Sequence, residues 1–125
     1  MEIVKAIGLG EKTDWPSTSL SHGEQRHLEI GLALAGRPKI LLLDEPAAGM
    51  TPYESLLTME LIKKVVREKG VAILFAEHDM DVVFSVADRI TVVHQGRVIA
   101  EGTPEDIKQN EEVKDVYLGR TYART

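Results

Sequence analysis

The sequence predicts an α/β domain with a largely parallel sheet, and three observations lead to this prediction. Two aliphatic runs, residues 40–43 and 71–76, have the composition of strands that are buried on both faces. Helical patterns alternate with these runs, as in parallel sheets. Each run ends in polar residues, Asp44-Glu45 after the first and Glu77-His78-Asp79 after the second. In open α/β sheets such strand ends share one edge, where ligands bind.

Composition limits the classes of protein that fit. A chain of 125 residues is long enough for one domain with a real core. The net charge of −5 argues against a nucleic-acid binder, and we interpret the one basic cluster, Lys63, Lys64, Arg67 and Lys69, as a solvated helix face. The absence of cysteine excludes disulfides and thiolate zinc sites and favours a reducing compartment. No apolar run has the length of a membrane span and no signal peptide is visible, so we expect a cytoplasmic location.

The first third of the chain predicts two helices joined by a loop. Residues 1–7 have helical spacing and are followed by Gly8, and residues 11–19 form a connection whose Trp15 we expect to pack against a neighbour. Ser21 and Glu24 have the spacing of a capping box, which starts a helix that ends at Gly36. Its predicted apolar stripe consists of Leu28, Gly31, Leu32 and Ala35.

After the first strand, a small-residue loop leads into a second long helix. The loop is Ala47-Ala48-Gly49-Met50, and Thr51-Pro52 then provides a cap and a proline at the first helical position. Gly70 ends this helix, which we expect to bury Leu57, Leu61, Ile62, Val65 and Val66. After the second strand, Asp79 can cap a short helix.

The last third predicts a β-hairpin followed by helices. Residues 90–93 and 97–100 read as the two strands, with Gly96 in the turn. Thr103-Pro104 repeats the Thr-Pro helix start, and polar, amphipathic helical sequence continues to Leu118. We expect three segments: residues 1–19 as a helical end and linker, 20–118 as the core, and 119–125 as a frayed tail.

Four groups of residues have the chemistry of a phosphate-hydrolysing site. Asp44 can hold a magnesium ion and Glu45 can orient an attacking water, although the alternative is a strand that simply runs into a polar turn. Ser21 and Gly23 lie at a helix N-terminus, which attracts phosphate. With His78 at the end of the second strand, the set suggests nucleoside triphosphate hydrolysis.

The order of these motifs resembles the C-terminal half of an ABC transporter ATPase domain. The motifs are Leu20-Ser21-His22-Gly23-Glu24-Gln25, then residues 40–46, then residues 47–50, then His78, at spacings similar to those of the family. The resemblance implies a partial P-loop NTPase-type parallel sheet with a C-terminal β-hairpin and short helices.

The resemblance also implies a role for each motif. The signature that contacts the γ-phosphate of ATP held by the opposite subunit would consist of Ser21, His22, Gly23 and Glu24. Asp44 would be the Walker B acid that holds Mg²⁺, Glu45 the general base and His78 the switch histidine that senses the γ-phosphate. The dimer-contact loop that signals between subunits would consist of Ala47, Ala48, Gly49 and Met50.

Three positions depart from the common pattern of the family. His22 stands where glycine is usual, and it is either a tolerated surface side chain or an imidazole that adds attraction for phosphate. Glu24 replaces the common glutamine and keeps the capping role. Met50 stands where aspartate is frequent, which argues against a polar contact across the dimer from this position. His27 and His94 have no partner at metal-ligand spacing, and we expect ordinary surface or half-buried residues.

Residues 22–25, 47–50 and 116–119 resemble the ATPase subunits of branched-chain amino acid importers or their urea-import relatives. This implies ATP and Mg²⁺ as cofactors in the complete domain, a second ATPase subunit and transmembrane permease subunits as partners, and a place on the inner face of the cell membrane. Two alternatives stay open: a nucleotide-independent interaction module, and an ABC ATPase of a non-transport system.

A glycine-rich P-loop does not occur in the sequence. We therefore expect a fragment that does not hydrolyse ATP by itself, since the P-loop carries most of the grip on the phosphates. In the family, the P-loop strand lies next to the strand of the switch histidine. The resemblance thus predicts an unpaired edge along residues 71–76, through which the isolated chain oligomerises.

Overall fold

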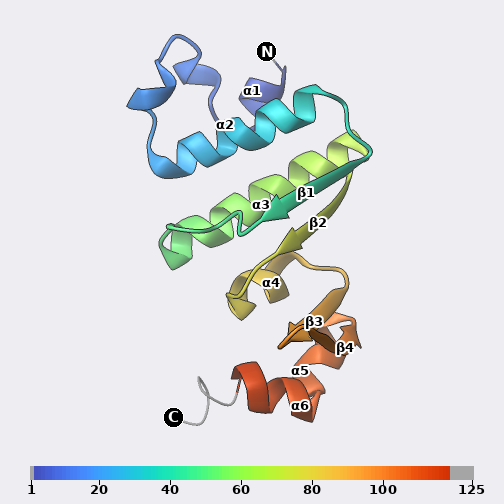
Figure 1. Cartoon of the computed structure of the whole chain (residues 1–125). Coiled ribbons are helices and arrows are strands. Elements are labelled where there is room, and N and C mark those ends of the chain that lie inside the picture. The colour runs from blue at the N-terminus through green and yellow to red at the C-terminus, as the bar shows by residue number, and fades with distance from the viewer. Residues whose placement is uncertain (1, 119–125) are drawn as a thin grey trace. The chain divides into compact units, whose positions relative to one another are not determined.

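The computed structural model describes residues 2–118, which fall into two compact units, residues 2–86 and 87–118 (Figure 1). The elements of the first unit, in chain order, are α1 (Glu2–Ala6), the 3-10 turns η1 (Gly10–Lys12) and η2 (Ser17–Ser19), α2 (His22–Ala35), β1 (Ile40–Asp44), α3 (Pro52–Lys69), β2 (Ala72–Ala76) and α4 (Met80–Val86). Those of the second unit are β3 (Ile90–His94), β4 (Arg97–Gly102), α5 (Pro104–Gln109), α6 (Glu111–Val113) and the π-helical turn η3 (Lys114–Leu118).

The two strands of the first unit form the predicted parallel pair. In the register of β1 and β2, Ile40 is opposite Ala72 and Asp44 is opposite Ala76. The Glu45 N–H donates a hydrogen bond to the Ala76 carbonyl at 2.8 Å, which extends the pairing beyond β1. The mixed α/β class with a parallel sheet and short helices is therefore confirmed.

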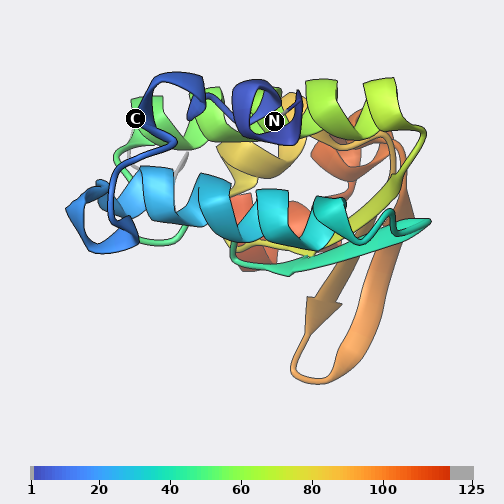
Figure 2. The same ribbon diagram turned by 90° about the horizontal axis from the view of Figure 1, so that it is seen from above.

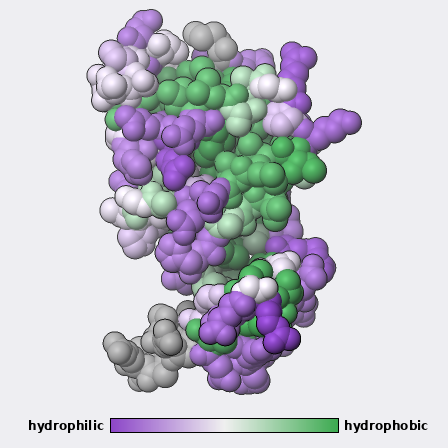
Figure 3. Space-filling model, viewed as in Figure 1, coloured by the Kyte–Doolittle hydropathy of each residue, from purple (hydrophilic) through white to green (hydrophobic). Residues whose placement is uncertain are grey.

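The prediction that both faces of these strands are buried is wrong. Leu41 is only 5% exposed, whereas Leu42 is 68% and Leu74 is 67% exposed. The reason is that α2 and α3 lie on one side of the strands (Figure 2), where Leu41 joins a core built from both helices. Within residues 2–86 no layer covers the other face, and an apolar patch lies over β1 and β2 in Figure 3.

The helix faces that tertiary packing buries agree with the predicted ones only in part. In α2 the buried residues are Ile30, Gly31 and Leu34, while Leu32 and Ala35 are exposed. In α3 the predicted Ile62, Val65 and Val66 are buried and Leu61 is half-buried, but Leu57 is exposed. The rest of the buried face of α3 consists of Ser55, Thr58 and Met59.

These two errors have one physical cause. Each helix carries apolar side chains on more than one face, and the periodicity does not tell which face meets the neighbouring helix. Trp15 is 51% exposed, and the neighbour that its ring contacts is the Lys12 ammonium, 4.7 Å from the ring centroid.

Local signals at the helix ends are confirmed. Ser21 with Glu24 and Thr51 with Glu54 form complete capping boxes at the starts of α2 and α3. Gly70 adopts the left-handed conformation that ends α3 (φ 66°). The Asp79 carboxylate accepts hydrogen bonds from the N–H groups of Asp81 and Val82 at the start of α4.

The second unit is a hairpin with helices packed on it. Strands β3 and β4 are antiparallel, and Gln95 and Gly96 both have positive φ (50° and 76°), which is typical of a tight hairpin turn. A third capping box at Thr103 starts α5, which contacts β4. The buried side chains of this unit are Ile90, Val92, Ile107 and Val113. The predicted tail, residues 119–125, lies outside the described residues.

Candidate functional site

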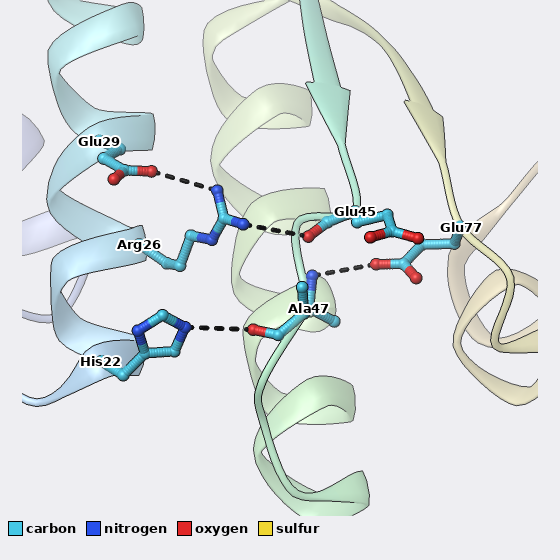
Figure 4. Close-up of polar contacts among 7 residues, drawn as sticks. His22, Arg26, Glu29, Glu45, Ala47 and Glu77 are labelled. Carbon is cyan, nitrogen blue, oxygen red and sulfur yellow. Dashed lines mark hydrogen bonds and ion pairs between the residues drawn. The ribbon is translucent and has the colours of Figure 1, made fainter.

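Three segments of the first unit meet at the carboxyl ends of β1 and β2. They are the N-terminal turn of α2, the loop that follows β1 and the residues that follow β2, and Figure 4 shows the polar contacts that join them. This convergence follows from the parallel register, which brings Asp44 and Ala76 opposite each other.

Glu45 and His78 form the central pair of this edge. Glu45 Oε1 lies 2.8 Å from His78 Nδ1, and the two side chains are 48% and 77% exposed. A polar contact this exposed contributes little stability. The contact thus positions two titratable side chains at the open edge of the sheet, where both can reach a bound molecule.

The backbone of Glu45 is strained. Its φ is 45°, a left-handed conformation that costs about 1–3 kcal/mol for a side chain other than glycine. Its carbonyl accepts hydrogen bonds from the Ala48 N–H (3.0 Å) and from Arg26 Nη2 (3.4 Å). These bonds hold a tight turn directly after the strand, and strain of this kind is concentrated at functional sites.

Asp44 is the last residue of β1 and is exposed. Within residues 2–118 no group of three or more His, Cys, Asp or Glu side chains lies close enough to hold a metal ion. That arrangement does not fit a cation caged by protein side chains alone. It does fit Mg²⁺, which usually takes one or two carboxylates and completes its shell with water and substrate phosphates.

The N-terminus of α2 offers main-chain donors. The capping box uses the N–H groups of Ser21 and Glu24 (3.0 and 3.2 Å), while those of His22 and Gly23 have no acceptor among the described residues. A methyl group added to Gly23 would meet only Met50 Cε, at 3.9 Å. Packing within this unit therefore leaves room for a side chain at position 23.

Glu24 is held as a carboxylate. A hydrogen-bonded ion pair with the Lys12 ammonium, reinforced by the Ser21 backbone N–H, lowers the pKa of Glu24 from its usual 4.5 to about 2. Because Lys12 neutralises this charge, the carboxylate caps the helix without leaving a free negative charge beside the exposed N–H groups.

The loop of residues 47–50 is tied to both neighbouring segments. The Ala47 N–H donates to Glu77 Oε1 at 3.0 Å, and His22 Nε2 lies 3.2 Å from the Ala48 carbonyl oxygen (Figure 4). Sequence reasoning missed Glu77 and Arg26. Glu77 follows the second strand directly, and Arg26 lies one helical turn after His22, so both signals were available in the sequence.

The structure brings His22 against the loop, an arrangement that neither of the two sequence alternatives described. The remaining histidines agree with expectation. His27 is half-buried, with Nε2 3.0 Å from Thr58 Oγ1, and burial lowers its pKa. The His94 and Tyr117 rings form a T-shaped pair, with their centroids 6.0 Å apart.

Comparisons with known proteins agree with this architecture. The family model described as "ABC transporter" matches residues 1–48, and the one described as "Branched-chain amino acid ATP-binding cassette transporter" matches residues 97–123. In the ADP conformation of MJ1267, an ATP-binding cassette of an ABC transporter, a similar fold is seen with a TM-score of 0.83 and 30% identity; it covers 94% of this chain and 48% of that one.

These matches, together with the fold, show that the chain belongs to the ABC transporter ATP-binding family. Among its curated relatives, the high-affinity branched-chain amino acid transport ATP-binding protein LivG of Salmonella typhimurium is 44% identical over 116 residues, which are 93% of this chain and 46% of LivG. The lipopolysaccharide export system ATP-binding protein LptB of Escherichia coli is 40% identical over 121 residues, which are 97% of this chain and 50% of LptB.

The chain thus spans about half the length of the curated relatives it matches. Among the described residues, no helix is both long enough and apolar enough to cross a membrane.

Proposed function

We propose that this chain supplies the signature and Walker B part of an ATP-hydrolysing subunit in an ABC importer for branched-chain amino acids. The observation that carries the proposal is the convergence of Asp44, Glu45 and His78 with the N-terminus of α2 at one edge of the sheet. The family models and LivG support both the class of protein and the transported substrate.

In this proposal each side chain acts on a nucleotide held largely by a P-loop. Glu45 polarises the attacking water, and His78, which contacts Glu45, senses the γ-phosphate. Asp44 holds Mg²⁺, which neutralises charge on the phosphates. Ser21 and the free N–H groups of His22 and Gly23 bind the γ-phosphate held by an opposite subunit, with His22 and Glu24 flanking that contact.

The same proposal includes partners and location. Residues 47–50 contact the second ATPase subunit, and transmembrane permease subunits hold the assembly at the cytoplasmic face of the membrane. The chain alone is inactive, because its sequence contains no P-loop lysine or cradle for the β- and γ-phosphates.

Complementation in trans tests the activity. The chain is mixed with the P-loop half of LivG, and Mg-ATP hydrolysis is measured. We expect activity only in the mixture, and its loss with Glu45→Gln, which keeps the size of the side chain and removes the charge. Gly23→Ala is the matched variant for the signature: the fold has room for the methyl group, so unfolding midpoints stay unchanged while hydrolysis falls at least tenfold.

A second candidate system comes from LptB, which is nearly as similar as LivG. Joining the chain to the first half of LivG or of LptB distinguishes the two. Restored leucine uptake through the LivG chimera supports the importer, and restored growth of an LptB-depleted strain alone supports lipopolysaccharide export. Tight capture of a partner without any hydrolysis in trans would favour the nucleotide-independent interaction module instead.

A further inference from the structure

His22 and Met50, two of the three positions that depart from the common family pattern, lie on two segments that approach each other, the first turn of α2 and the loop of residues 47–50. His22 Nε2 lies 3.2 Å from the Ala48 carbonyl oxygen, on the loop that ends at Met50. Met50 Cε in turn lies 3.9 Å from the position that a Cβ of Gly23 would occupy. The first turn of α2 and the loop of residues 47–50 therefore approach each other at two points, where the His22 imidazole contacts the Ala48 carbonyl and where the Met50 methyl group faces Gly23.

The backbone of Gly49 makes the first contact possible. Its φ is 77°, and a Cβ at this position would lie 3.0 Å from His22 Nε2 and 3.3 Å from His22 Cδ2. Any side chain here would be strained by the backbone and would also push the imidazole away. The glycine thus leaves space for the imidazole ring to reach the loop backbone.

At the second point of approach, Met50 also contacts a buried residue. Met50 Sδ lies 3.3 Å from Thr58 Oγ1, and Thr58, only 3% exposed, also lies 3.0 Å from His27 Nε2. Met50 is thus held by Thr58 of α3, which His27 of α2 contacts in turn, while its methyl group faces Gly23. The loop has one fixed end at Met50 and another at Ala47, whose N–H is bound by Glu77.

Between these two ends, the His22 side chain contacts the Ala48 carbonyl and so joins the middle of the loop to α2. We propose that His22 is a positioning residue that couples residues 47–50 to the N-terminus of α2 within the same chain. The inference deepens the proposed function, because it makes the phosphate-binding end of α2 and the dimer-contact loop move together. In its absence the loop is free to fluctuate, as exposed loops do.

Amide hydrogen exchange of the chain itself tests the contact without any assumption about activity. The reporters are the N–H groups of Ala48 and Met50, which donate to Glu45 and Ala47 carbonyls inside the loop. We expect His22→Ala to accelerate their exchange about fivefold, as the loss of one hydrogen bond does. His22→Gln, whose amide nitrogen can reach the same carbonyl, should restore the slow rate, and His94→Ala in the other unit should change nothing. Equal exchange rates in His22→Ala and the unmodified chain would overturn the proposal.

The second measurement uses the assembly complemented with the P-loop half of LivG. We expect His22→Ala to lower kcat about fivefold with KM for ATP unchanged, and His22→Gln to recover most of kcat. A raised KM with unchanged exchange would assign His22 to direct phosphate binding and overturn the positioning role, as would faster exchange with unchanged kcat. If the unmodified assembly hydrolyses no ATP, the proposed function fails, while the exchange experiment still decides on the contact.

Discussion

The interactions of single residues set the charge at the start of α2. The Glu24 carboxylate lies between the Lys12 ammonium and the Ser21 N–H, so the helix is capped by a charge that is already compensated. Two neighbouring N–H groups, those of His22 and Gly23, stay available to an incoming anion. Because of this ion pair, Glu24 caps the helix without an uncompensated negative charge that would repel a phosphate.

Removal of the Lys12 charge should raise the pKa of Glu24. In the folded chain this pKa is about 2, below the usual 4.5, so the contribution of Glu24 to stability is present above pH 4.5 and is lost as pH falls toward 2. With Lys12→Met we expect the titration to move up toward 4.5, as followed by the NMR shift of the Glu24 carboxyl carbon. Asp106, whose pKa is lowered by Thr103 in the other unit, is the internal control and should not respond. An unchanged Glu24 titration would contradict the assignment.

At the scale of whole elements, close packing joins α1 to α2. Gly31 is buried in α2, and a Cβ built there would lie 2.6 Å from Ile7 Cδ1. Ile7 is itself only 2% exposed, at the centre of a small cluster with Leu9 and Leu20. The absence of a side chain at position 31 thus allows Ile7 to pack directly on the helix backbone.

A double-mutant cycle measures this contact. Ile7→Val removes the Cδ1 atom that a methyl group on Gly31 would strike, while alanine is favoured over glycine in a helix by about 1 kcal/mol. Urea unfolding measures the change in the free energy of unfolding that Gly31→Ala causes in each background. We expect this change to be more favourable by about 1 kcal/mol or more in the Ile7→Val background than in the unmodified chain. If the two substitutions instead change the free energy of unfolding additively, within about 0.5 kcal/mol, then Ile7 does not restrict position 31.

At the scale of the whole molecule, the exposed face and edge of the first unit's sheet favour association with other chains. Leu42 and Leu74 are exposed on its open face, and among the described residues β2 pairs only with β1. Unpaired strand edges and apolar patches of this kind associate with other chains. The exposed face and the unpaired edge are properties of the chain as a whole, because they depend on which helices and strands the sequence contains.

We expect the chain to form dimers or larger oligomers as its concentration rises, as recorded by light scattering. Leu74→Lys should shift the population toward the monomer, because a charge on an edge strand opposes pairing. Val98→Lys, which replaces another exposed apolar residue in the hairpin, is the control and should have no effect. A stable monomer at high concentration in the unmodified chain would contradict the prediction.

The sequence alone was sufficient wherever the deciding interaction is local. Capping boxes at Ser21, Thr51 and Thr103 join residues three apart, and the hairpin turn depends on the two adjacent residues Gln95 and Gly96. The parallel pairing of residues 40–44 with 72–76 was also predictable, because two aliphatic runs separated by a long helix have few other arrangements. The shared edge with Glu45 and His78 follows from that pairing.

Only the tertiary structure decided which helix faces are buried and how the loop after β1 is held. His22 contacts Ala48 across 26 residues, Ala47 contacts Glu77 across 30, and His27 contacts Thr58 across 31. No local periodicity encodes such pairs, because they arise when α2 and α3 pack on one face of the strands. The same packing buries Leu41 and leaves Leu42 exposed, although both are leucines in one strand: successive side chains of a strand point to opposite faces, and the helices cover only one of them.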